Sequence, residues 1–166
     1  MKKIVLFAAM ALLLSPLCAS AATTDTAIIT LTIPAILNIE LNGAAQTVAP
    51  AAATLTEMLA GKMTAIDGGQ ITVDANQTWS LSVNASIATF TGTGDNAKVV
   101  DTLEVKVAPG GTYIALNADG TTAVQVLGPA VAAETAGTHN ILYQFISGFG
   151  DLPGTYVATL TYTIST

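Results

Sequence analysis

The sequence predicts an all-β protein, an antiparallel two-sheet β-sandwich of eight to ten short strands. Apolar and polar residues alternate with a period of two through most of the chain, which is typical of strands with one buried face. Threonine, a β-branched residue that favours strands, occurs 25 times. Turn residues separate the alternating runs, and no stretch of ten residues has convincing helical spacing. A closed barrel would fit the same pattern.

The first 21 residues have the three parts of a secretory signal peptide. Two lysines follow Met1, an apolar run extends from Ile4 to Leu14, and Pro16 precedes a small-residue end at Ser20-Ala21. The run is shorter than the roughly 20 residues that span a bilayer. We therefore expect a signal helix at 1–21. The mature chain, residues 22–166, would form a single β-sandwich domain in the periplasm, at the cell surface or outside the cell.

The composition argues against several classes of partner. The chain has a net charge of −6, no arginine, and three lysines after residue 21: Lys62, Lys98 and Lys106. Nucleic acids and anionic membrane surfaces are bound by clusters of basic side chains, so we expect neither partner and no membrane insertion of the mature chain. Cleavage removes Cys18, the only cysteine, so packing must hold the domain without disulfides.

Two alternating runs near the N-terminus predict the first strand. Every odd position is apolar from Ala27 to Ile33, and the same phase continues from Ala35 to Leu41. Pro34 lacks an N–H and suits a sheet edge or a bulge. We expect both runs to lie in the domain's own sheets, with a bend or a change of sheet at Pro34. Residues 44–54 are expected to form a loop.

The middle of the chain predicts a hairpin. Ile71–Ala75 and Trp79–Ala85 alternate on either side of Asn76-Gln77, and Asp67-Gly68-Gly69 before them has the composition of a turn. Residues 55–63 fit either a helical turn or a short strand.

Further strands are expected towards the C-terminus. Alternating patterns occur at 103–107, 113–116, 124–126 and 156–164, with loops at 91–96, 128–138 and 148–154. The run from Ile141 to Ile146 is apolar on both faces, which predicts a central strand.

Few residues suit catalysis or metal binding. His139 has no cysteine partner and no metal-binding spacing, and we interpret it as a solvent-facing side chain at a strand end. Ser147-Gly148-Phe149-Gly150 is not a nucleophile elbow, because that motif needs a following helix. Asp95-Asn96 and Asn117–Gly120 offer oxygen ligands for calcium, but plain turns have the same composition. We expect no catalytic, cofactor-binding or metal-ligating residue, and no enzyme.

Trp79 could act as a sugar-stacking platform or as a core anchor. It shares its phase with Leu81 and Val83, which favours the core. Leu152–Tyr156 has the start of a cell-wall sorting motif, but an alternating run follows, so a turn that enters the last strand is the better interpretation.

Two segments, Ile71–Val83 and Leu152–Ile164, resemble exported bacterial immunoglobulin-like β-sandwich proteins, some of them fimbrial or associated with surface layers. The C-terminal alternating strand also resembles that of chaperone–usher pilins. The chain departs from pilins in lacking their cysteine pair, and Tyr162 is not next to last. The resemblance implies a secreted or cell-surface structural or interaction protein, whose partners are other subunits or surface components. Two alternatives remain open: a fimbrial subunit that inserts Thr26–Ile33 into a neighbour's sheet edge, and a carbohydrate-binding module.

Overall fold

The computed structural model describes residues 29–43, 47–49 and 51–166, so the predicted signal helix lies outside the described residues. The chain divides into two units, residues 1–33 and Pro34–Thr166, and each is described by itself. In the described residues the structure has eight strands in two antiparallel sheets. The all-β prediction is confirmed at that level, and a closed barrel is excluded because each sheet has two separate edges. No helix within these ranges is long and apolar enough to cross a membrane.

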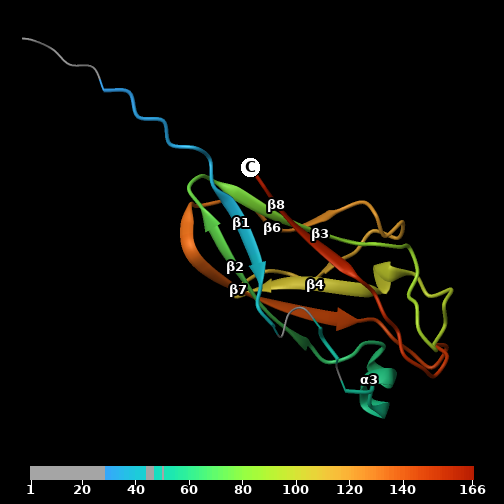
Figure 1. Cartoon of the computed structure of the whole chain (residues 1–166). Helices are drawn as coiled ribbons and strands as arrows, with labels where there is room; N and C mark the ends of the chain where they lie inside the picture. Colours follow the sequence, from blue (N-terminus) through green and yellow to red (C-terminus); the bar gives the residue numbers. More distant parts are fainter. Residues whose placement is uncertain (1–28, 44–46, 50) are drawn as a thin grey trace, which may run out of the picture. The chain divides into compact units, whose positions relative to one another are not determined.

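Figure 1 shows the two sheets of the unit Pro34–Thr166. The five-stranded sheet has the order β1 (Leu37–Leu41), β2 (Ile66–Ala75), β7 (Glu134–Phe145), β4 (Leu103–Ala108) and β5 (Ile114–Ala115). The three-stranded sheet has the order β6 (Val124–Val131), β3 (Trp79–Ala85) and β8 (Leu160–Ser165). The short helix α3 (Leu55–Ala60) and the 3-10 turn η1 (Val100–Thr102) lie between strands.

Buried side chains from both sheets form one apolar core. β2 contributes Ile71 and Val73, and β3 contributes Trp79, Leu81 and Val83. Since these rows belong to one cluster, the two sheets pack face to face. Trp79 is only 1% exposed, which confirms its prediction as a core anchor.

The predicted strand at 27–33 is wrong over its described part. Residues 29–36 have neither helix nor strand, and β1 begins only at Leu37. The side chains of Ile29, Leu31 and Ile33 are 90%, 81% and 74% exposed. The alternating pattern predicts which side chains lie on the same side of the chain. It does not show whether that side is buried in a core.

The predicted hairpin of β2 and β3 is also wrong. The two strands belong to different sheets, because both of their apolar rows face the same core from opposite sides. Asp67-Gly68-Gly69 is not a turn between strands but a bulge within β2, opposite β7. Glycine is required at position 68, since a Cβ there would lie 2.4 Å from the ring of Tyr143.

The ambiguous segment 55–63 contains the helix α3. Thr54 caps it, Glu57 closes a capping box, and Gly61 ends it in the left-handed conformation. The loop predicted at 128–138 is wrong, because β6 continues to Val131 and β7 begins at Glu134. The prediction of a central strand at 141–146 is confirmed over β7, which lies between β2 and β4.

Candidate functional site

His139 lies inside β7, so its interpretation as a solvent-facing strand end is wrong. Its Nε2 is 2.8 Å from Oε1 of Glu134, and its ring packs edge-on against Trp79 with 5.3 Å between ring centroids. Gly137 leaves room for the pair, since a Cβ there would lie 2.0 Å from the Glu134 carboxylate. Ala136, with φ 50°, interrupts the regular alternation between the two partners.

The contacts of the His139–Glu134 pair indicate a structural role. Within the described ranges, the His139 side chain hydrogen-bonds only to Glu134, and no hydroxyl or thiol lies within hydrogen-bond distance of its ring. The Nε1 of Trp79 donates to the carbonyl of Ala132 at 3.1 Å. A hydrolytic pair would need a nucleophile on the imidazole. The pair instead fastens the first residues of β7 to the core.

Ser147 is buried in the segment that follows β7. It is 6% exposed, its N–H donates to the carbonyl of Gly61 at 3.2 Å, and its Oγ has no hydrogen-bond partner in the part of the chain that the structure describes. Because the Ser147 hydroxyl is buried, a substrate cannot reach it. No basic side chain among the described residues hydrogen-bonds to it.

The two aspartate loops are turns. The carboxylate of Asp95 accepts the N–H of Ala97 at 2.8 Å. The carboxylate of Asp119 accepts the backbone N–H groups of Thr121 and Thr122 and the Thr122 hydroxyl. These bonds, led by the Thr122 hydroxyl, lower the pKa of Asp119. The described residues contain no group of three side chains that could hold a metal ion.

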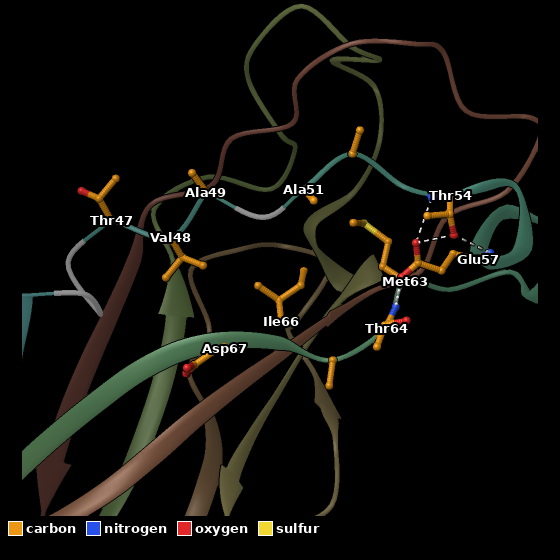
Figure 2. A pocket seen from close by; sticks show the side chains of 12 residues that line it. Thr47, Val48, Ala49, Ala51, Thr54, Glu57, Met63, Thr64, Ile66 and Asp67 are labelled. Atoms are coloured by element: carbon orange, nitrogen blue, oxygen red, sulfur yellow. Dashed lines mark hydrogen bonds between the residues drawn. The ribbon is translucent and has the colours of Figure 1, made fainter.

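Figure 2 shows a pocket of about 500 Å³ beside the start of β2. Its wall combines apolar side chains, among them Val48, Met63 and Ile66, with polar groups. Among the described residues that line the pocket, Glu57 and Asp67 are the acidic ones. The Glu57 carboxylate accepts the N–H groups of Thr54 at 2.8 Å and Thr64 at 2.6 Å.

These bonds, with the backbone bond to Thr54 the largest cause, lower the pKa of Glu57 to about 2. The ionised Glu57 carboxylate therefore joins the start of α3 to the chain after it, at Thr64.

The N-terminal segment, which the structure describes from residue 29 to residue 33, offers a different kind of site. Its described part, 29–33, exposes three large apolar side chains at alternate positions, separated by Thr30 and Thr32. No charged residue interrupts it. Exposed alternating rows of this kind are what a strand presents before it pairs with a sheet.

Asn76 holds the chain directly after this segment. Its Nδ2 donates to the carbonyl of Pro34 at 2.7 Å, and its Oδ1 accepts the N–H of Ile36 at 2.8 Å. The backbone N–H of Asn76 donates to the carbonyl of Ile36 at 3.2 Å. Residues 34–36 are thereby fixed to the turn that joins β2 and β3, and we call this contact the Asn76 clasp.

One flank of the two sheets is formed by the strands β1 and β8, whose core-facing side chains are only partly buried. The edge strands β1 and β8 lie against each other there (Figure 1). The inward-facing residues of both strands are only half-buried: Leu37, Ile39 and Leu41 on β1, and Leu160, Tyr162 and Ile164 on β8. We call this region the β1–β8 flank. The partial exposure of these side chains contrasts with the complete burial of the inward-facing residues of the neighbouring strand β3.

Tyr162, one of the residues of the β1–β8 flank, forms a pair with Tyr143. The hydroxyls of Tyr143 on β7 and Tyr162 on β8 are 2.6 Å apart, which joins the two sheets. Burial, with a further contribution from Tyr143, raises the pKa of Tyr162 far above its usual value. Burial also raises the pKa of Tyr143.

Sequence reasoning missed the roles of Asn76, Glu134 and the tyrosine pair. The sequence places Asn76 in a turn, and no local signal shows that its amide reaches residues distant in the chain. Tyr162 shares its phase with Leu160 and Ile164, which predicts an inward side chain but not its partner.

The sequence matches no protein-family model, and a comparison with curated proteins finds no match.

Proposed function

We propose that this chain is an exported structural subunit with an immunoglobulin-like sandwich fold, which joins a larger assembly by donating its N-terminal segment as a β-strand. In this proposal residues 1–21 are a cleaved signal peptide and residues 22–166 are the mature subunit, at the cell surface or in the periplasm. The subunit has no catalytic activity. Its partner is a protein with an open sheet edge.

The exposure of Ile29, Leu31 and Ile33 carries the proposal. Burying each of these side chains is worth about 1.5–3 kcal/mol. Pairing as a strand would bury the three together, since side chains at alternate positions face one side of a sheet. It would also give the segment's backbone N–H and C=O groups hydrogen-bond partners, as in other cases of strand addition.

The other open functions have less support. A self-contained monomer would hold residues 27–33 in its own sheet, and the described part of that segment has no strand. A carbohydrate-binding module would need an exposed aromatic platform, and Trp79, the side chain that the sequence offers for this role, is buried in the core.

Assembly of the mature chain, residues 22–166, tests the proposal. Light scattering after size exclusion and electron microscopy should show oligomers or filaments. The donor variant, Ile29→Ser with Leu31→Ser and Ile33→Ser, should be monomeric with an unchanged melting temperature. The matched control, Thr30→Ser with Thr32→Ser, should assemble as the wild type does. A monomeric wild type, or a donor variant that assembles normally, would contradict the proposal.

A further inference from the structure

The outward face of the five-stranded sheet has a pocket of about 610 Å³, which we call the outer pocket. Most of its lining comes from β2 and β7, which pair side by side. The lining residues are Asn42, Ala65, Asp67, Gly69, Gln70, Ala108, Asn140 and Leu142. No residue of the segment 29–33 is among them, so a ligand in this pocket would not depend on the proposed strand donation.

A bulge in β2 opens the middle of the outer pocket. Between Asp67 and Gln70, β2 has one residue more than the facing stretch of β7. The bulge contains Gly69, whose φ of 76° lies in the left-handed region that favours glycine. Bulges are common beside binding sites, and glycine in a strand often marks a place where a ligand approaches the backbone. Gly69, Ala65 and Ala108 have no long side chain, which leaves room for a ligand.

Leu142 gives the outer pocket an apolar surface. It lies on the central strand β7 between Ile141 and Tyr143, whose buried side chains face the core. Because successive side chains of a strand point to opposite faces, Leu142 points outward, where it is half-buried. Ligand pockets typically combine such an apolar surface with a few polar groups that fix the orientation of the ligand.

Two amide side chains from neighbouring strands supply such polar groups. Gln70 on β2 and Asn140 on β7 are direct register partners, and Nε2 of Gln70 donates to Oδ1 of Asn140 at 2.8 Å. An amide oxygen accepts two hydrogen bonds and an amide nitrogen donates two. Oε1 of Gln70 therefore remains as an acceptor and Nδ2 of Asn140 as a donor, and neither atom has a partner within the described residues.

Two further oxygens complete the lining. The Asp67 carboxylate accepts the N–H of Gly69 through Oδ1 at 2.9 Å, which leaves Oδ2 as an acceptor. Asn42 directs its Nδ2 towards Oγ1 of Thr72 at 3.5 Å, which leaves its Oδ1 as an acceptor. Acceptor oxygens thus predominate, and the ligand that matches them carries several O–H donors. Among the described lining residues none is cationic, so a carboxylate or phosphate ligand would have no charge partner there.

From these groups we infer that the outer pocket binds a neutral sugar ring. Each hydroxyl of a sugar can both donate and accept a hydrogen bond. Of two neighbouring hydroxyls, one donates to Oε1 of Gln70 and the other accepts from Nδ2 of Asn140. The C–H groups of the ring pack against Leu142. The Asp67 carboxylate accepts from a third hydroxyl, and its charge repels an anionic sugar.

The outer pocket differs from an aromatic platform, on which the successive sugars of a chain stack. It holds one ring and relies on hydrogen bonds, each of which contributes modestly to affinity, so we expect a dissociation constant of about 1 mM. Calcium is the other ligand that such oxygens attract, but it takes roughly six to eight of them. Asp67 is the one carboxylate among the described lining residues, which favours the sugar.

Saturation-transfer difference NMR of the mature chain, residues 22–166, tests this inference, because it detects ligands bound to monomers and to assemblies alike. The probes are the methyl glycosides of glucose, galactose, mannose and N-acetylglucosamine, and at least one of them should bind. The pocket variant, Gln70→Ala with Asn140→Ala, should raise its dissociation constant about tenfold or more. The matched control, Ser82→Ala with Thr163→Ala, removes a facing pair from the outward side of the other sheet and should bind as the wild type does.

A second variant and two further ligands complete the test. Ala65→Phe places a ring in the lining of the outer pocket and should also abolish binding, and it decides the test if the pocket variant has a lower melting temperature. The methyl glycoside of glucuronic acid should not bind, because Asp67 repels its carboxylate. Calcium alone should give no binding heat in titration calorimetry.

Four results would overturn the inference. They are binding of none of the neutral probes, unchanged binding by either folded variant, a glucuronide that binds as tightly as the neutral sugars, and calcium binding that the pocket variant removes. None of these results bears on strand donation, which the assembly of the donor variant tests separately.

Discussion

Two segments of this chain have the same alternating pattern and opposite surroundings. In β3, the residues Trp79, Leu81 and Val83 are almost completely buried, whereas Ile29, Leu31 and Ile33 in the N-terminal segment are almost completely exposed. The half-buried row of β8 lies between these extremes. The difference shows that a period of two identifies side chains that share a face, while the neighbours of the strand decide whether that face is covered.

The largest effect on stability is expected in the buried strand β3. Replacing Trp79 with alanine should lower the free energy of unfolding by about 3–5 kcal/mol, because it leaves a cavity beneath β7 and removes the ring on which His139 packs. Chemical denaturation followed by circular dichroism measures this change. A loss below about 1 kcal/mol would mean that the tryptophan does not anchor the core.

A matched pair of leucines compares the two segments directly. Leu81→Ala should lower the free energy of unfolding by about 2–5 kcal/mol. Leu31→Ala should change it by less than about 0.5 kcal/mol in the monomer, because the side chain is already exposed. Both variants are measured at a concentration at which the donor variant is monomeric. Equal losses would show that residue 31 is buried within its own subunit.

The half-buried strand β8 should make the stability of the protein sensitive to alkaline pH. The pKa of Tyr162 is raised by burial and by Tyr143, so the fold favours the neutral phenol. The stability from this pair is complete below about pH 10 and is lost as the pH rises above it. Tyr162→Phe should cost about 1 kcal/mol at neutral pH. Between pH 10 and 12 it should lose less stability than the wild type in urea titrations, and equal losses would contradict this role.

The smallest effect is expected at α3, which buries no side chain. The depressed pKa of Glu57, about 2, means that its contribution is present above about pH 4.5 and is lost as the pH falls towards 2. The protection factor of the Thr64 amide, which is its intrinsic exchange rate divided by its observed rate, should therefore fall on acidification. Glu57→Gln should show a low protection factor at Thr64 that changes little over the same pH range. A Thr64 protection factor in the wild type that is as high at pH 2 as at pH 7 would refute the assignment.

The alternating pattern of apolar residues predicted where strands occur, but not which strands lie next to each other in a sheet. Alternation placed β3, β4 and the central β7 correctly, because one-sided burial leaves a period of two in any strand. It could not show that β2 and β3 belong to opposite layers, since a hairpin and a crossing between layers bury the same residues. The loop predicted at 128–138 is wrong because glycine and proline usually end a strand, whereas β6 continues past Gly128 and Pro129.

The candidate site was predicted only in part. The sequence identified residues 26–33 as a possible donor, since its alternation and lack of charge are visible in the chain itself. The open edge of β8 could not be predicted, because it depends on β8 ending a sheet and on the register that directs the backbone groups of Leu160, Tyr162 and Ile164 away from β3. His139 was misplaced for a similar reason: its partner Glu134 reaches it through an irregular backbone at Ala136.

The Asn76 clasp has a mechanical consequence. If copies are joined through their N-terminal segments, tension along the assembly enters each subunit at Pro34, directly before β1. The force first meets the three hydrogen bonds of Asn76, and only after these break does it reach the five residue pairs that join β1 to β2. The clasp thus protects the first strand of the sheet from tension that is applied to the N-terminal segment.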